Sequence, residues 1–94
     1  MRKYLISFDL NNKLDRTNDY KKIDDLLYGL GSVCKPLSNV YLLASDDVVS
    51  SEIRNKLMDF LSVYDKVIVL KLEGPYASFN FRQINSEISE IMKK

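Results

Sequence analysis

The strongest constraint on the fold is an apolar run next to the N-terminus. Residues 4–10 read Tyr-Leu-Ile-Ser-Phe-Asp-Leu, and Asn11 and Asn12 then break the pattern. A run of this length, ended by turn-forming residues, is typical of a strand that is covered on both faces. We therefore expect it to lie centrally in a sheet. Asp9 would stand at or near its carboxyl end, and rigid scaffolds often present functional residues on the loops that follow such ends.

Three further strands are predicted downstream. A short one at 32–35 is expected to bend at Pro36, because proline cannot donate to a strand ladder. A firmer one covers Asn39 to Ala44, and the strongest runs from Val67 to Leu72, where nearly every residue is apolar.

Two helices separate these strands, and each has one apolar stripe. The first stripe comprises Tyr20, Ile23, Leu26, Leu27 and Leu30, and the second comprises Ile53, Leu57, Phe60 and Leu61. We expect Thr17 or Asn18 to cap the first helix and Gly31 to end it, with Asp47 or Ser50 capping the second.

The C-terminal part adds an extended segment at 76–81 and an amphipathic helix with Ile84, Ile88, Ile91 and Met92 on one side. The order predicts an α+β fold, a ferredoxin-like βαββαβ sandwich with two helices on one face of an antiparallel sheet. The 94 residues are expected to form a single domain, with a core over 1–81 and the C-terminal helix over 82–94. Because the strands are apolar on both sides, the C-terminal segment or a second copy should cover the other face. The pattern thus predicts a homodimer through the sheet.

The composition excludes several kinds of catalytic site. The chain has no histidine, and Cys34 is its one cysteine, so Ser-His-Asp and Cys-His catalysis and the usual zinc sites are excluded. We expect Cys34 to be a small buried apolar side chain. Carboxylates, lysine, arginine, tyrosine and oxygen-bound hard cations remain available for chemistry.

The charge balance leaves the choice of partner open. Fourteen basic and thirteen acidic residues give a net charge of +1, which neither supports nor excludes nucleic-acid binding. No signal peptide and no apolar stretch long enough to cross a bilayer is recognised, so a cytoplasmic protein without membrane contact is expected.

The run at 4–10, the predicted element order and the strand that begins Ser38-Asn39-Val40-Tyr41 resemble the small CRISPR-associated Cas-two proteins. They also resemble the related virulence-associated protein D toxins. The resemblance covers Arg2 to Phe81, and stand-alone bacterial and phage relatives of this group have a tail similar to residues 77–81.

This resemblance implies a homodimeric phosphodiesterase in which the aspartate that ends the first strand binds the metal. That role, catalytic and metal-binding, falls on Asp9. The family's basic residues near the first strand are matched loosely by Arg2, Lys3 and Lys13. The family usually has serine where this chain has Asn39, and Ser38 stands one position earlier. Many members related to the CRISPR-associated group act as scaffolds for duplex DNA, so the resemblance leaves catalysis open.

Two interpretations of Asp9 follow. It either binds Mg²⁺ or Mn²⁺, since magnesium needs only one or two protein carboxylates, or it closes the strand through an Asx-turn. Asn11 extends the site in the first interpretation, and Arg82 is a candidate phosphate contact. Tyr76, Phe79 and Phe81 are expected to cover the sheet or the dimer interface, with base stacking as the alternative.

The function expected from these features is nucleic-acid processing by a homodimer, as a metal-dependent endoribonuclease or endonuclease that acts on RNA or DNA. The alternative is a non-catalytic homodimeric module on the same fold. Such a module would bind nucleic acid or a protein partner as a scaffold, inhibitor or regulator, for example in a toxin–antitoxin or CRISPR system.

Overall fold

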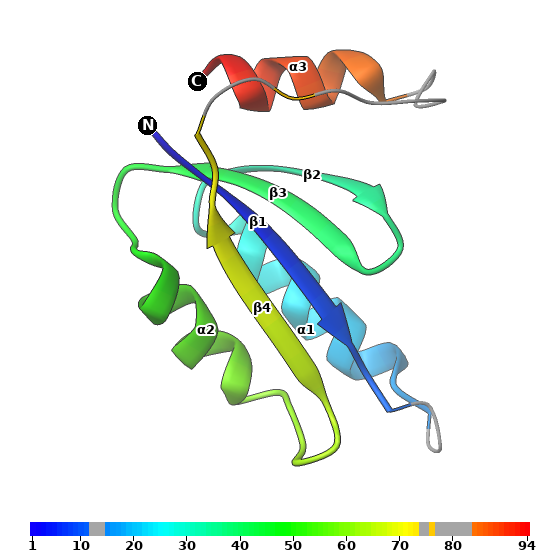
Figure 1. The fold of residues 1–94 in the computed structure, drawn as a ribbon. Coiled ribbons are helices and arrows are strands. Elements are labelled where there is room, and N and C mark those ends of the chain that lie inside the picture. Colours follow the sequence, from blue (N-terminus) through cyan, green and yellow to red (C-terminus); the bar gives the residue numbers. More distant parts are fainter. Residues whose placement is uncertain (12–14, 74–75, 77–83) are drawn as a thin grey trace.

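The computed structural model of the chain describes residues 1–11, 15–73, 76 and 84–94. These residues form an α+β fold with the element order βαββαβα (Figure 1). The strands are β1 (Arg2–Asp9), β2 (Ser32–Leu37), β3 (Val40–Ser45) and β4 (Lys66–Lys71). The helices are α1 (Thr17–Tyr28), α2 (Ser50–Met58) and α3 (Asn85–Lys93).

The four strands form one antiparallel sheet in the order β2-β3-β1-β4. β1 therefore lies between two neighbours, which confirms the central position predicted for the N-terminal run. Ser7 is opposite Val40 on β3 and Ile68 on β4, and Asp9, the last residue of β1, is opposite Lys66. This register determines which residues accompany Asp9 on its side of the sheet.

The main core lies between the sheet and helices α1 and α2. It contains Tyr4, Ile6, Phe8 and Leu10 of the first strand and its end, Tyr41 and Leu43 of β3, Ile23 and Leu27 of α1, and Ile53 and Leu57 of α2. The predicted helical stripes thus face the sheet as expected. Since neighbouring residues of a strand point to opposite faces, Leu5, Ser7 and Asp9 lie on the other side.

The C-terminal helix α3 covers part of that second face. Its Ile88 and Ile91 form a separate buried cluster with Cys34, Leu42 and Ala44 of β2 and β3, and the β2–β3 hairpin separates α3 from α1 (Figure 1). The Lys3 ammonium donates a hydrogen bond to the carbonyl of Met92, at 2.6 Å, and ties β1 to the end of α3.

Among the described residues, α3 packs on β2 and β3, and most of the β1–β4 half of the same face carries exposed side chains. We call this surface the open half-face; it consists of Ser7, Asp9, Lys66, Ile68 and Leu70. Ile68 is 53% exposed and Leu70 is 48% exposed. On the helix side of β4, Val67 and Val69 are partly buried against the main core. Cover of the other side of β4 by a second copy stays a prediction.

The helix starts differ from the prediction. α1 begins at Thr17, and no side chain makes a capping hydrogen bond; instead, Asp15 accepts hydrogen bonds from the backbone N–H and the hydroxyl of Thr17. α2 has Val49 at its N-cap and likewise no capping side chain. Neither Asp47 nor Ser50 therefore has the capping role that sequence preference suggested.

Gly31 does not have the helix-ending role predicted for it. Gly29 is the C-cap, in the right-handed helical conformation that any residue adopts. Gly31 lies so close to β3 that a Cβ there would collide with the carbonyl group of Ala44. Its lack of a side chain thus permits close strand approach rather than helix termination.

Within the described residues, no helix is long and apolar enough to span a lipid bilayer.

Candidate functional site

Asp9 is an exposed carboxylate at the end of the central strand, on the open half-face. Within the described part of the chain, it takes part in no hydrogen bond or ion pair. The backbone N–H of Asn11, which would close an Asx-turn, instead donates to the Asp65 carboxylate at 2.7 Å. Local structure therefore leaves the Asp9 oxygens available to a ligand.

Two predicted site residues lie next to Asp9. Ser38 and Asn39 are exposed in the turn between β2 and β3, and the Asn39 carbonyl accepts a hydrogen bond from the N–H of Phe8 at 3.1 Å. Lys66, which sequence reasoning had not assigned to a site, is the β4 partner of Asp9. An acid, a cation and two polar side chains thus gather at one end of the sheet.

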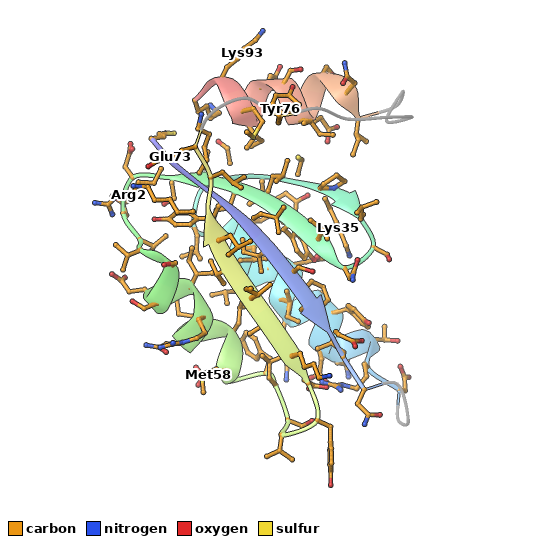
Figure 2. The ribbon with its side chains drawn as sticks, in the orientation of Figure 1. Arg2, Lys35, Met58, Glu73, Tyr76 and Lys93 are labelled. Carbon is orange, nitrogen blue, oxygen red and sulfur yellow. The ribbon has the colours of Figure 1, made fainter. Side chains whose placement is uncertain are left out.

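Arg2 and Lys3 lie at the other end of β1, roughly 20 Å from Asp9 at the usual rise of a strand. Both contact main-chain carbonyls: Arg2 reaches Val48 at 3.4 Å and Lys3 reaches Met92 at 2.6 Å. Figure 2 shows Arg2 at the start of β1. The structure therefore does not bring these two basic residues together with Asp9.

The remaining predicted residues are placed only in part. Tyr76 is 45% exposed, and its hydroxyl lies 3.1 Å from that of Ser89 on α3 (Figure 2). This puts Tyr76 beside α3. The other predicted site residues, Lys13, Phe79, Phe81 and Arg82, lie outside the residues that the structure describes.

A partly buried ion pair fixes the backbone that follows Asp9 and the turn that precedes β4. Two guanidinium nitrogens of Arg16 donate to the two oxygens of Asp65 at 2.9 and 2.7 Å, and the Asp65 side chain has no exposed surface. The N–H groups of Asn11 and Ser62 also donate to Asp65, at 2.7 and 2.8 Å. A third Arg16 nitrogen binds Asp19 at 2.6 Å. The network joins the β1–α1 connection to the α2–β4 turn.

This network sets the protonation of both partners. The hydrogen bonds from Arg16 hold the pKa of the Asp65 carboxyl well below its usual range, and the bonds to Asp65 and Asp19 raise the pKa of the Arg16 guanidinium. Both groups remain charged and their polar atoms are occupied. Their role is to hold the two loops in place, and proton transfer is not expected of them.

Two hollows flank the α2–β4 turn. The larger, about 750 Å³, lies between the start of α1 and the end of α2 and includes Asp15, Asp19, Asp59, Lys22 and Phe60 in its lining. The smaller, about 520 Å³, lies between α2 and β4 and includes Arg54, Met58, Val63 and Lys66. Carboxylates predominate in the first, whereas arginine and lysine line the second.

The described residues of one chain do not provide enough ligand side chains for a metal ion. Among the described residues, no three acidic or cysteine side chains come close enough to hold one. Asp9 contributes a single carboxylate, so a complete site requires a second copy of the chain or a substrate phosphate.

Cys34 is 2% exposed beneath α3, and burial, with the nearby charge of Glu87, raises the pKa of its thiol to about 11. It is a buried apolar side chain, as predicted.

Sequence reasoning missed the Arg16–Asp65 pair and the position of Lys66. In the sequence, Asp65 stands just before the predicted strand that begins at Val67, and Arg16 lies in the connection before the first predicted helix. The two are 49 positions apart, and neither belongs to a recognisable motif. Only the pairing of β1 with β4 brings their loops together.

Comparison with known proteins supports the fold alone. No protein-family model and no curated protein matches the chain. The chain is similar to the crystal structure of the hypothetical protein TT1823 from Thermus thermophilus, with a TM-score of 0.65 and 18% sequence identity over 84% of this chain and 90% of that one. At this identity, the likeness establishes a common architecture and says nothing of activity.

Proposed function

We propose that this protein is a homodimeric, metal-dependent nuclease in which Asp9 from two copies binds Mg²⁺ or Mn²⁺. The observation that carries the proposal is the state of Asp9: an exposed carboxylate at the end of the central strand, with no hydrogen-bond or ion-pair partner among the described residues. A charged side chain that stabilises nothing locally is a candidate for binding or catalysis.

The architecture is consistent with the proposed family. The strand order β2-β3-β1-β4, with α1 and α2 on one face, agrees with a ferredoxin-like domain. The resemblance of the first strand and the Ser38–Tyr41 segment to Cas-two-like proteins supplies the proposed chemistry. The likeness to TT1823 adds support for the fold only.

The proposed dimer forms through the open half-face. Exposed Ile68 and Leu70 lie there on the same side of the sheet as Asp9, and adjoining apolar residues of this kind mark contact surfaces. Pairing of two β4 edges is less favourable, because an antiparallel pair centred on that strand would set Lys66 of one copy opposite Lys71 of the other. Face packing avoids this repulsion and allows a two-fold axis to pass near Asp9.

The residues at this end of the sheet suit a phosphodiester substrate. Two carboxylates meet the requirement of magnesium, whose other positions are filled by water and phosphate oxygens. When bound, the ion would lower the pKa of a water molecule and offset the charge of the phosphate. Lys66 would neutralise part of the remaining phosphate charge, and the exposed Asn39 would orient the strand by hydrogen bonding. RNA and DNA share the phosphodiester that these groups recognise.

A non-catalytic homodimer is the second candidate. It is favoured by the absence, among the described residues, of a three-ligand metal cluster in one chain. In this alternative the open half-face still pairs two copies, and the sheet end binds nucleic acid or a protein without cleaving it.

Cleavage of labelled single-stranded RNA and duplex DNA, with magnesium, manganese or chelator, separates the two candidates. Asp9→Ala and Asp9→Asn should abolish metal-dependent cleavage while leaving the dimer intact. Asp25→Ala, which removes an exposed carboxylate of α1, is the matched control and should cleave like wild type. Equal cleavage by wild type and both Asp9 variants, or no cleavage by any of them, would contradict the nuclease proposal.

A further inference from the structure

β4 is an edge strand of the sheet, and its outer side has no strand partner among the described residues. On the inner side, the Leu72 N–H donates to the Lys3 carbonyl at 2.8 Å, which continues the pairing of β4 with β1. Successive residues of an antiparallel strand direct their polar backbone groups to opposite sides. Val67, Val69 and Lys71 therefore direct their N–H and C=O groups outward, where another strand could pair with them.

A groove of about 520 Å³ lies on the helix side of this edge, between α2 and β4. Figure 1 shows α2 beside β4 and running in the opposite direction. Met58, at the end of α2 in Figure 2, and Val63 line the groove and are 56% and 91% exposed. Val67 lines it from the strand. An apolar side chain of an added strand would here contact other apolar side chains instead of water.

The groove also has a cation whose charge is not balanced within the described structure. Arg54 lies one turn before Met58 on the same side of α2, and its guanidinium donates to the amide oxygen of the neighbouring Asn55 at 3.2 and 2.9 Å. The carboxylate in the lining, Asp65, is already paired with Arg16 at 2.7 Å. An acidic side chain is therefore attracted to this part of the groove.

The cation and the apolar lining lie at different levels along β4. One turn of helix rises about 5.4 Å, and two residues of strand rise about 6.6 Å. Because Met58 and Val67 line the same groove and α2 runs opposite to β4, Arg54 lies about level with Val69. Residues directly opposite each other in an antiparallel pair have their side chains on the same face. On an added strand, the residue opposite Val67 thus enters the apolar part of the groove, and the residue opposite Val69 approaches Arg54.

We propose that the outer edge of β4 binds an extended segment of another protein as an added antiparallel strand. An acidic residue of this segment pairs with Arg54, and an apolar residue two positions later fills the groove. The outward backbone groups of β4 provide hydrogen bonds that any strand can make, and the groove selects the side chains.

A second copy of β4 does not meet this requirement. The strand reads Lys-Val-Ile-Val-Leu-Lys and contains no acidic residue to pair with Arg54. The dimer proposed above packs through the open half-face and leaves the edge of β4 free. This inference does not depend on the proposed nuclease, because Arg54, Met58 and the outward backbone groups have no part in the metal site.

The test is the binding of a fluorescein-labelled peptide with the core Thr-Glu-Thr-Leu-Thr to full-length protein, measured by anisotropy. In the proposed register, glutamate is opposite Val69 and leucine is opposite Val67, so the N–H groups of these two peptide residues face β4. N-methylation of the leucine removes one hydrogen bond to the edge and should weaken binding about tenfold. N-methylation of the central threonine, whose N–H faces away from β4, is the matched control and should leave binding unchanged.

Variants of the protein test the charge and the edge separately. Arg54→Glu should weaken binding about tenfold, and it should bind a peptide with lysine in place of glutamate more tightly than wild type does. Lys56→Glu, on another side of α2, is its control and should bind like wild type. Lys71→Pro removes an outward N–H at the end of an edge strand, where proline is tolerated, and should also weaken binding. Lys71→Ala keeps this N–H and loses only an ammonium group that pairs with Glu73 at 3.5 Å, so it should bind like wild type.

Several results would overturn the proposal. They are a dissociation constant above about 1 mM for the unmodified peptide, equal weakening by the two N-methylations, or unchanged binding by Arg54→Glu. Dissociation of the protein dimer by the peptide, seen in sedimentation velocity, would assign the edge to a second copy. Tighter Arg54-dependent binding of labelled oligothymidine than of the peptide would assign it to nucleic acid. Thermal unfolding establishes that each variant is folded, and if Lys71→Pro is not, the N-methylated peptides still test the edge.

Discussion

Arg16 holds Asp65 through two parallel hydrogen bonds, 2.9 and 2.7 Å long, across 49 positions of sequence. The pair joins the loop after β1 to the turn before β4, and both segments flank Asp9. The same contact supports the turn at the end of the groove between α2 and β4. The position of the candidate site thus depends on an ion pair that takes no part in its chemistry.

Removing this carboxylate should destabilise the protein strongly. Asp65→Ala removes two hydrogen bonds of the Arg16 guanidinium and the acceptor of the N–H groups of Asn11 and Ser62. Loss of these bonds to a charged, partly buried carboxylate costs about 2 kcal/mol in the free energy of unfolding. Asp59→Ala, in the exposed segment just before this turn, should stay within about 0.5 kcal/mol of wild type. Urea unfolding monitored by circular dichroism measures both. Equal stability of the two variants would contradict the anchoring role of Asp65.

The same pair predicts how stability depends on pH. The pKa of Asp65 is lowered in the folded state, mainly by Arg16, whereas an unfolded aspartate titrates near 3.9. The stabilisation is therefore present above about pH 4 and is lost as the pH falls from there towards the folded pKa. The gap in unfolding free energy between wild type and Asp65→Ala should be constant near neutrality and should narrow below about pH 4. A gap that widens on acidification would contradict the assignment.

Alanine substitution at the two glycines after α1 should change the stability of the protein in opposite directions. Gly31→Ala forces a methyl group against the carbonyl of Ala44, and such overpacking costs about 1–3 kcal/mol. Gly29→Ala meets only ordinary contacts, at 3.4 Å, in a helical conformation, and should stabilise the protein by about 0.5 kcal/mol through the unfolded state. Thermal melts of the two variants rank them, and the reverse order would refute the structural role of Gly31.

Charge on the open half-face should disrupt the proposed dimer. Ile68→Glu places a carboxylate on the surface proposed to pair two copies, so we expect a monomer in sedimentation velocity and loss of Asp9-dependent cleavage. Tyr28→Glu is the matched control, since Tyr28 is 58% exposed on α1, compared with 53% for Ile68. If Ile68→Glu remains a dimer, the interface lies elsewhere.

Hydrophobic spacing predicted the helices and strands well because the apolar residues that set the spacing are also the residues buried in the core. The run at 4–10 contains every β1 residue that points into the main core, and Ile88 and Ile91 mark the helix that covers Cys34 and Leu42. The strand at 32–35 continues to Leu37, however, because β2 is an edge strand with an irregular register between Cys34 and Leu37. An edge with a bulge tolerates Pro36.

The candidate site was predictable only where it lies on an element end. Asp9 ends a strand that the sequence shows clearly, and its position was confirmed. Lys66 and the Arg16–Asp65 pair depend on the pairing of β1 with β4, which no local pattern specifies. The capping predictions at Thr17 and Ser50 were wrong because cap preferences are small beside the packing of each helix on the sheet.

Metal titration of the dimer tests the central claim most directly. If Asp9 from two copies forms one site, isothermal titration with Mn²⁺ should give one ion for every two chains, and Asp9→Ala should abolish binding while remaining dimeric. The same binding by Asp9→Ala and wild type, or no binding by wild type, would contradict a metal centre at Asp9. The fold and the open half-face would then stand, and the protein would not be a nuclease with its metal at Asp9.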